Sequence, residues 1–271
     1  QYAVAHGIPV LQPVKMKDPA FVEELRSYEA DLQVVVAFRI LPEIVWAMPR
    51  FGTFNVHAAL LPQYRGAAPI NWAIINGETE TGVTTFFLDK DIDTGKIIMQ
   101  KHFAIPDEAD VEYVYDGLMH LGAEIAIKTI DKMLENNGNI DSISQGDFSR
   151  FSEDELKTAP KIFKETCQID WTLPAKRVYD FVRGLSPYPG TWTHLEENGR
   201  QSVLKIFKTA KTSAIGSGET GSIKIEKGHL YVMCGDAWLE VLELQMAGKK
   251  RMNARDFLNG MRGKSFRMLT K

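Results

Sequence analysis

Cysteine is scarce in this chain of 271 residues, in which only Cys167 and Cys234 occur. Two isolated cysteines cannot build the disulfide framework of a small secreted domain, nor do they form the paired pattern of a zinc site. Such sparse cysteine usage is typical of proteins from a reducing compartment. We therefore expect a cytoplasmic protein, and a single disulfide between the two cysteines is the open alternative.

Other signatures are absent as well. No apolar run approaches the roughly 20 residues that a membrane helix needs, so we expect no membrane partner. The sequence contains no complete GxxxxGK[S/T] phosphate loop and no HExxH motif, which are the patterns of nucleotide hydrolysis and of zinc-dependent hydrolysis. We accordingly expect no bound metal. The apolar content of 44% and the charged content of 25% are ordinary for a soluble globular protein.

Net charge is also small, at −3, but it is unevenly distributed. Residues 1–158 hold 13 of the 32 Lys and Arg and 24 of the 35 Asp and Glu, a net of −11. The remaining 19 basic and 11 acidic residues give residues 159–271 a net of +8. This asymmetry suggests that the second half meets a polyanion, although a basic solvated domain would show the same count.

Short β-rich runs alternate with helical patterns in the first half. Leu32–Phe38 is a nearly continuous apolar run, as expected of a strand buried on both faces of a parallel sheet. Asp18-Pro19 is a helix-start signal. The alternation predicts a Rossmann-like α/β domain with a largely parallel sheet. The other predicted strands span 8–11, 53–57, 81–88 and 97–105, and the predicted helices 19–28, 42–48, 69–76 and 107–136.

The pattern changes after Asn136-Asn137-Gly138-Asn139. Residues 139–158 are polar and are predicted to be a linker. From there to the C-terminus, short β runs at 203–207, 221–225, 229–233 and 238–244 accompany one helix at 175–185 and a closing helix at 253–260. This pattern predicts a small OB-like β-barrel. We therefore divide the chain into a domain at 1–138, a linker at 139–158 and a barrel domain at 159–271.

The strongest chemical signal is the pair Asn55 and His57, followed by Asp93. Phe54-Asn55-Val56-His57 alternates apolar and polar residues, so the amide and the imidazole point to one face of a strand. Together they could bind and protonate an oxygen, while Asp93 orients the imidazole and raises its basicity. This combination suits acyl transfer without a nucleophilic side chain.

The stretch from Asn55 to Gly95 resembles the folate-dependent formyltransferases, which hold a catalytic Asn, His and Asp in this order. Residues 37–42 (AFRILP) are similar to the family's pterin-binding segment. The runs at 60–69, 161–171 and 244–250 are similar to members that act on methionyl-tRNA. The resemblance implies transfer of the formyl group of 10-formyltetrahydrofolate to the α-amine of initiator methionyl-tRNA, with Asn55, His57 and Asp93 as the catalytic residues.

Binding residues follow from the same resemblance. The folate is expected to contact Phe38, Arg39, Ile40, Leu41, Leu60, Leu61, Pro62 and Asp89. The tRNA is expected to contact Arg65 in the loop after the catalytic strand and basic residues near the C-terminus, namely Lys249, Lys250, Arg251, Arg262 and Lys264. Such phosphate contacts supply affinity and position rather than sequence discrimination. Trp171, Tyr188 and Trp192 are expected in the core.

The start of the sequence suggests a longer protein. Gln1–His6 resembles the end of a helix that Gly7 terminates, and no first strand precedes it. The resemblance implies about fifty further residues, including that strand and a loop that helps to hold the tRNA acceptor end. We expect the full protein, a monomer, to carry them.

Two other functions remain open at this point. A formyltransferase acting on an amino sugar or another small amine would share the catalytic residues, but the basic second half argues against it. A non-catalytic tRNA-binding protein would share the second half but would not need the catalytic constellation.

Overall fold

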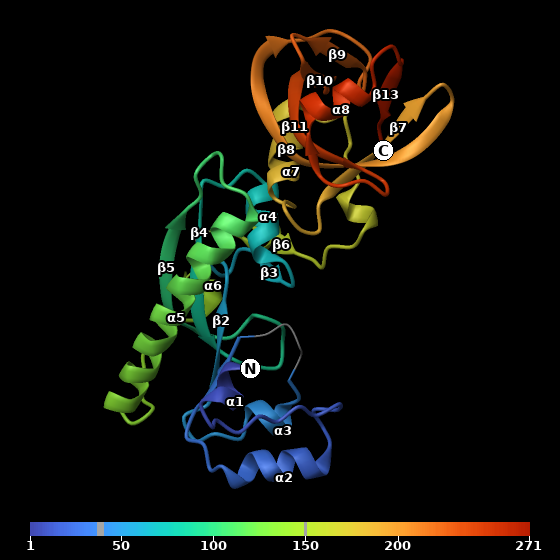
Figure 1. Cartoon of the computed structure of the whole chain (residues 1–271). Coiled ribbons are helices and arrows are strands. Elements are labelled where there is room, and N and C mark those ends of the chain that lie inside the picture. The colour runs from blue at the N-terminus through green and yellow to red at the C-terminus, as the bar shows by residue number, and fades with distance from the viewer. Residues whose placement is uncertain (37–40, 149–150) are drawn as a thin grey trace. The chain divides into compact units, whose positions relative to one another are not determined.

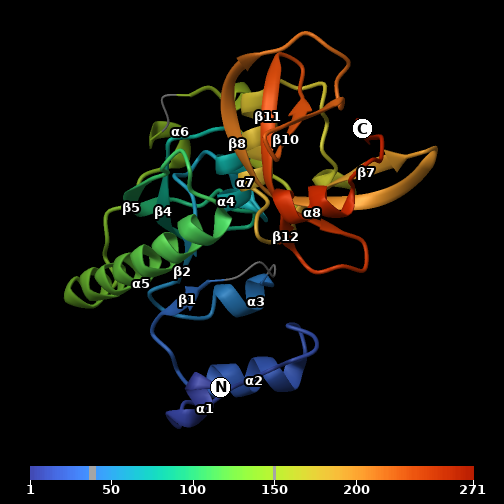
Figure 2. The ribbon, with the colours of Figure 1, turned by 45° about the horizontal axis from the view of Figure 1, so that its top comes forward.

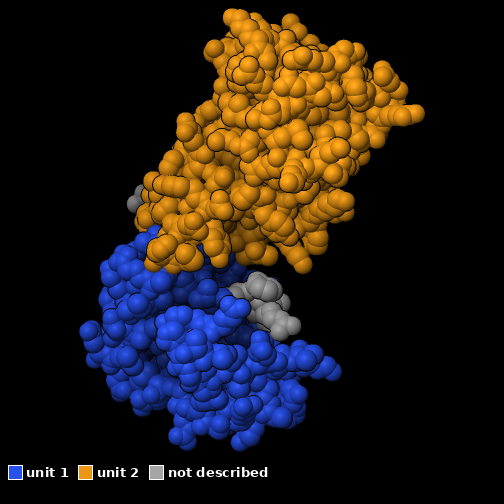
Figure 3. Space-filling model, in the orientation of Figure 1, with its two compact units in different colours: residues 1–65, 83–101, 121–156 blue, residues 66–82, 102–120, 157–271 orange. Residues whose placement is uncertain are grey.

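The computed structural model describes residues 1–36, 41–148 and 151–271 (Figure 1). The chain forms two compact units that interleave along the sequence (Figure 3). The first unit comprises residues 1–65, 83–101 and 121–156, and the second comprises residues 66–82, 102–120 and 157–271.

A four-stranded sheet contains the strand that the sequence predicts to hold Asn55 and His57. Its order is β1 (Gln33–Val35), β2 (Thr53–His57), β4 (Glu80–Phe87) and β5 (Ile97–Ala104). β1 pairs with β2 in parallel, whereas β4 runs antiparallel to β2. The predicted α/β architecture is confirmed, and its parallel pairing lies between β1 and β2.

Helices of the first part of the chain start where the local sequence favours them. Pro19 occupies the first turn of α2, and the Asp18 carboxylate caps the helix by accepting a hydrogen bond from the Ala20 amide at 3.0 Å. The predicted start of this helix is therefore confirmed. The helices are α1 (Tyr2–Ala5), α2 (Pro19–Ser27), α3 (Glu43–Trp46), α4 (Pro69–Ile75), α5 (Val111–Glu135) and α6 (Gln145–Phe148), and the short strands are β3 (Arg65–Gly66) and β6 (Thr158–Ala159).

Of two strand predictions near the N-terminus, one is wrong, and the other is right about the strand but wrong about its burial. Ile8–Leu11 forms no strand. The apolar run that begins at Leu32 forms the short β1, and Val34 is 41% exposed rather than buried on both faces. β1 lies at one end of the sheet and has β2 as its only strand neighbour among the described residues. The hydrophobicity of the run predicts a strand but not the number of its neighbours.

Residues of the second half form an antiparallel sheet of seven strands (Figure 2). Its main path runs β13-β7-β8-β11-β10-β9, and β12 pairs with β11. The Met268 amide, in β13, donates to the Gly221 carbonyl, just before β9, at 3.0 Å. The sheet is thus curled so that its ends meet, and the predicted barrel-like domain is confirmed as a curled half-barrel. The strands are β7 (Thr191–Glu197), β8 (Arg200–Ile215), β9 (Ile223–Glu226), β10 (His229–Met233), β11 (Ala237–Met246), β12 (Met252–Asn253) and β13 (Phe266–Leu269).

Two helices, α7 (Ala175–Arg183) and α8 (Ala254–Gly260), contribute to the core of this half-barrel, and short 3-10 turns at Glu153–Glu155 and Glu165–Cys167 precede it. Trp171 is fully buried there, and its indole N–H donates to the Thr193 hydroxyl at 3.1 Å. The expectation that Tyr188 lies in the core is wrong, because its side chain is 83% exposed. The loop that carries it turns its ring outward, which periodicity could not reveal.

Both cysteines are buried free thiols, so they do not form the disulfide that the sequence left open. Burial raises the pKa of the Cys234 thiol to about 12, which keeps it protonated and unreactive at neutral pH. Across the described ranges no helix is both long enough and apolar enough to cross a membrane.

Candidate active site

β2 brings Asn55 and His57 to one face of the sheet. The two side chains alternate with Phe54 and Val56 along the strand, and they are 7% and 6% exposed. β2 is flanked by β1 and β4, and His57 lies opposite Thr84 of β4. Because strands on both sides fix the backbone of β2, the amide and the imidazole have little freedom to move. The predicted pairing of these two groups on one face is confirmed.

Both nitrogens of the His57 ring face protein groups. Nε2 lies 2.9 Å from the Tyr64 carbonyl oxygen. Since a carbonyl oxygen can only accept, Nε2 carries a hydrogen and donates it. Nδ1 lies 3.9 Å from Oδ2 of Asp93, which is too far for a direct hydrogen bond but close enough for attraction once the ring is charged. Nδ1 is therefore the ring atom that can take up or release a proton.

Burial lowers the pKa of His57 from its ordinary value of 6.5. The negative charge of Asp93 and the hydrogen bond to the Tyr64 carbonyl oppose this effect by stabilising the imidazolium. Desolvation is the largest of these contributions, so the free ring is neutral at pH 7. The charge of Asp93 then decides how readily the ring accepts a proton when negative charge develops beside it.

Asn55 carries the least satisfied polar group of the site. Its Oδ1 is buried and has no hydrogen-bond partner among the described residues. A buried polar atom left in this way costs about 1–3 kcal/mol of stability. Rotating the carboxamide by half a turn would exchange Oδ1 and Nδ2, so the same position can present an N–H group to a carbonyl oxygen. The described residues thus leave a buried polar atom of the site without a hydrogen bond.

Asp93 lies in the loop between β4 and β5. Its φ angle is +57°, a left-handed conformation that Asp tolerates better than most residues. Its side chain is 12% exposed. Gly95, two residues on, makes the turn possible: a Cβ there would lie 1.6 Å from the Phe87 carbonyl oxygen. The Asp-Thr-Gly sequence therefore fits the backbone that directs Asp93 at His57.

Hydrogen bonds from Thr84 and Gln100 hold the loop that follows β2. The Thr84 hydroxyl donates to the Ala59 carbonyl at 2.6 Å and accepts from the Leu61 amide at 3.1 Å. The Gln100 carboxamide donates to the Leu61 carbonyl at 2.8 Å. The Leu61 side chain, 1% exposed, packs against Phe86. Leu61 therefore supports the loop from inside, and Leu60 is the more exposed of the two leucines.

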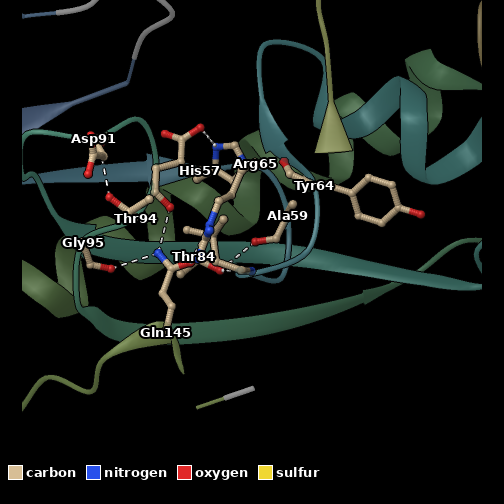
Figure 4. A network of polar contacts seen from close by, with 11 residues as sticks. His57, Ala59, Tyr64, Arg65, Thr84, Asp91, Thr94, Gly95 and Gln145 are labelled. Carbon is tan, nitrogen blue, oxygen red and sulfur yellow. Dashed lines mark hydrogen bonds and ion pairs between the residues drawn. The ribbon is translucent and has the colours of Figure 1, made fainter. Parts of the chain in front are cut away.

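One buried polar side chain of the site, Gln145, escapes prediction from the sequence. It lies in α6, inside the polar segment that is predicted to be a linker, and it is 3% exposed. Its carboxamide nitrogen donates to the carbonyl oxygens of Asp93 and Gly95 at 2.8 and 2.9 Å. Its carboxamide oxygen accepts from Nε and Nη2 of Arg65 at 2.9 and 2.7 Å (Figure 4). No motif around Gln145 signals these long-range contacts.

The other predicted folate contacts are only partly described. Phe38, Arg39 and Ile40 lie outside the described residues, and Leu41 is the first residue after them. Pro62 is buried beside Leu61. The Asp89 carboxylate accepts from the Asp91 amide at 3.1 Å and from the Thr94 hydroxyl at 2.8 Å, so it organises its own loop. The folate contacts of these residues remain predictions.

The predicted tRNA-binding residues of the C-terminal half are all exposed. Three of them have partners within the chain: Arg251 forms an ion pair with Glu243 at 2.6 Å, Lys264 with Glu197 at 2.9 Å, and Arg262 donates to Asn259 at 3.0 Å. Lys249 and Lys250 lie in the turn between β11 and β12 and have no ion pair among the described residues. These two lysines can approach a polyanion without breaking an existing contact.

No cluster of His, Cys, Asp and Glu in the described part of the chain could hold a metal ion. The described site instead combines a buried amide, an imidazole, a carboxylate and an arginine. This set of groups can bind a carbonyl oxygen, stabilise negative charge on it and move a proton.

Comparison with known proteins gives consistent matches along the chain. A family model for formyl transferase matches residues 3–130, and a model for the formyl transferase C-terminal domain matches residues 161–262. A methionyl-tRNA formyltransferase from Parabacteroides distasonis is 58% identical over 264 residues, 97% of this chain and 81% of that protein. One from Flavobacterium johnsoniae is 44% identical, over 96% of this chain and 81% of that protein.

Solved structures show the same fold at lower identity. The sugar 3N-formyltransferase WlaRD, solved with dTDP and 5-N-formyl-THF, matches with a TM-score of 0.64 at 20% identity, over 92% of this chain and 81% of that one. HypX from Aquifex aeolicus, in complex with tetrahydrofolic acid, matches with a TM-score of 0.62 at 20% identity. That match covers 89% of this chain, which spans only 41% of the HypX chain.

Proposed function

Because the chain belongs to the formyl transferase family, we propose that it transfers the formyl group of 10-formyltetrahydrofolate to the α-amine of initiator methionyl-tRNA. The family uses folate-derived formyl donors. Relatives named methionyl-tRNA formyltransferase, which are 44–58% identical over nearly the whole chain, support the acceptor. The observation that carries the chemistry is that Asn55, with its unpartnered amide oxygen, and His57 are buried on the same strand, and that the Asp93 carboxylate lies 3.9 Å from the His57 ring.

In the first step, the neutral α-amine attacks the formyl carbon, and the carbonyl π electrons move onto oxygen. The Asn55 carboxamide donates an N–H to this oxygen as its negative charge grows. Because the group is fixed in β2 and shielded from water, it needs no reorganisation at that moment, which is the condition under which such donors are most effective. After the half-turn of the carboxamide, Nδ2 occupies the position that has no partner in the free protein, and its N–H makes this hydrogen bond in the transition state.

His57 and Asp93 manage charge and protons in the same step. Nε2–H stays on the Tyr64 carbonyl, so Nδ1 is the atom that gains a proton. The amine proton is transferred toward Asp93, directly or through a water molecule, and from there to Nδ1 of His57. Nδ1 lies 3.9 Å from Oδ2 of Asp93. The resulting imidazolium stabilises the oxyanion. The C–N10 bond then breaks, N10 receives the proton, and the products are formylmethionyl-tRNA and tetrahydrofolate.

The remaining residues position the substrates. We assign Leu41, Leu60, Leu61, Pro62 and Asp89, with Phe38, Arg39 and Ile40, to the folate side of the site. The Arg65 guanidinium donates to the Gln145 carboxamide, which in turn contacts the loop that carries Asp93. From this position Arg65 can approach a phosphate of the acceptor end. Lys249 and Lys250, together with Arg251, Arg262 and Lys264, form the basic surface that we assign to the tRNA body.

A transfer assay tests the proposal directly. The purified protein is incubated with 10-formyltetrahydrofolate and either methionyl-tRNA or a dTDP-linked amino sugar, and formylated product is quantified by mass spectrometry. We expect formylation of methionyl-tRNA and none of the amino sugar. Formylation of the amino sugar with methionyl-tRNA untouched would overturn the acceptor assignment. Binding of tRNA with no formyl transfer to either acceptor would favour a non-catalytic role.

A further inference from the structure

Gln145 stands out because it is a buried polar side chain at the centre of a network that joins segments distant in sequence. It reaches back 80 residues to Arg65 and 52 residues to Asp93. Its contacts use the full hydrogen-bonding capacity of a carboxamide: both N–H groups donate, and the oxygen accepts twice. Such complete use of one buried group fixes its position tightly.

The partners also fix which way the carboxamide points. On one side lie two carbonyl oxygens, which can only accept, and on the other side lies a guanidinium, which can only donate. A flipped carboxamide would set its N–H groups against Arg65 and its oxygen against the carbonyls of Asp93 and Gly95. Figure 4 shows Gln145 with the dashed contacts that connect it to this loop and to Arg65.

We infer that Gln145 is a positioning residue that holds the Asp93 loop against His57 and, through the same carboxamide, holds the Arg65 guanidinium beside that loop. This inference rests on the proposed function for the roles of Asp93 and Arg65. Asp89 organises this loop from within through Asp91 and Thr94, and Gln145 adds an anchor from outside the loop by holding the Asp93 carbonyl.

Chemically, this arrangement links the acceptor side of the site to the catalytic side. When a phosphate of the acceptor binds Arg65, a displacement of the guanidinium moves the Gln145 carboxamide to which it is hydrogen-bonded. The same carboxamide is hydrogen-bonded to the carbonyls of Asp93 and Gly95, so the loop that carries them moves with it. The carboxylate that faces Nδ1 of His57 is on that same loop. The position of the acceptor phosphate at Arg65 and the position of the Asp93 carboxylate beside His57 therefore both depend on the Gln145 side chain.

The test compares Gln145→Met with Gln145→Glu. Methionine keeps the length and volume of the side chain and removes all the hydrogen bonds, so neither Asp93 nor Arg65 is supported any longer. We expect kcat to fall on the order of 10- to 100-fold, as small misplacements of catalytic groups do, and KM for methionyl-tRNA to rise. Glutamate still accepts from Arg65 but repels the two carbonyls, so we expect a similar fall in kcat with KM nearly unchanged.

A spectroscopic readout separates positioning from a merely structural role. The titration of the His57 ring is followed by NMR in the wild type, in Gln145→Met and in the matched control Gln12→Met, an exposed glutamine of the same compact unit. Asp93 is the charged group that raises the pKa of His57, and Tyr64 adds its carbonyl. Release of Asp93 should therefore lower the titration midpoint in Gln145→Met and leave it unchanged in the control.

The outcomes are distinguishable from failure of the proposed function. An unchanged His57 midpoint in folded Gln145→Met, with wild-type kcat, would overturn the inference. A lower melting temperature with an unchanged midpoint would show that Gln145 only stabilises the fold, which also overturns it. If Gln145→Met does not fold, the midpoint in Gln145→Glu decides. The titration needs no acceptor, so it remains decisive even if the wild type fails to formylate methionyl-tRNA.

Discussion

Among the individual residues of the site, Asn55 is the one whose buried polar group lowers the stability of the fold while serving the proposed reaction. Its carboxamide oxygen is buried without a partner, whereas the neighbouring buried hydroxyl of Thr84 is fully used. Asn55→Leu keeps the number and branching of the side-chain heavy atoms and removes the unsatisfied atom. We expect its free energy of unfolding to equal or exceed that of the wild type, because an unpartnered buried polar atom costs about 1–3 kcal/mol. We expect turnover to fall on the order of 10²–10³-fold.

Urea denaturation and a formylation assay on the same sample check both halves of this prediction. Thr84→Val is the contrasting variant: it removes a hydroxyl that is hydrogen-bonded on both sides, so it should destabilise the fold by about 1–3 kcal/mol. An Asn55→Leu protein with near-normal turnover would rule out Asn55 as the donor to the oxyanion.

Asp93 is the second residue whose role can be isolated. Asn keeps the size of the side chain and tolerates the positive φ of this position, so Asp93→Asn should fold normally. It removes the negative charge that opposes the effect of burial on His57. We therefore expect the pKa of His57 to fall further and turnover to drop. An NMR titration of the imidazole measures the first effect, and a midpoint that rises or stays constant would contradict the assignment.

The same substitution makes a prediction about stability and pH. The pKa of His57 is lower in the folded protein than the value of 6.5 expected for the unfolded chain, so the unfolded state binds the proton more readily. The contribution of the neutral ring is complete above about pH 6.5 and is lost as the pH falls toward the folded pKa. Asp93→Asn lowers that pKa and should steepen the loss of stability below pH 6.5. Thermal unfolding at pH 5.5 and 7.5 measures the difference.

Among the secondary-structure elements, the turn between β4 and β5 depends on Gly95. A Cβ at this position would lie 1.6 Å from the Phe87 carbonyl oxygen, and backbone cannot yield as a flexible side chain would. Gly95→Ala should therefore displace the turn that carries Asp93, with a loss of several-fold or more in kcat and a lower melting temperature. Gly146→Ala, in α6 beside Gln145, meets nothing within 4 Å and should leave both unchanged. Equal behaviour of the two variants would contradict a special role for Gly95.

The elements that sequence could predict are those with a short-range signal. The alternation in β2 predicts that Asn55 and His57 share a face, because the period of a strand is fixed by its backbone. The Asp-Thr-Gly turn is equally local. Gln145 escapes prediction because a glutamine in a polar segment is indistinguishable from a linker residue until the chain folds back on Arg65 and Asp93.

Over the full chain, the distribution of charge was predictable but the pairing of charges was not. Nothing in the sequence indicates that Arg251 and Lys264 are engaged by Glu243 and Glu197, since those partners come from other strands. A paired arginine has to give up its carboxylate before it can bind a phosphate, which reduces the net gain. Lys249 and Lys250 have no ion pair among the described residues, so they can bind a phosphate without losing a carboxylate partner. The basic surface is therefore uneven, and its contribution to affinity should concentrate at Lys249 and Lys250.

The final prediction follows from this unevenness. The double substitution Lys249→Ala and Lys250→Ala should weaken tRNA binding and reduce the slope of log K against log salt by roughly one for each phosphate that is no longer neutralised. KM for 10-formyltetrahydrofolate and kcat at saturating tRNA should not change, because the catalytic groups lie on β2 and in the loop after β4. Filter binding from about 50 to 200 mM salt measures the slope. The matched control replaces Lys15 and Lys17, two exposed lysines of the acidic half, with Ala. If the control lowers the slope as much as the test variant does, the effect reflects net charge alone, and the tRNA surface lies elsewhere.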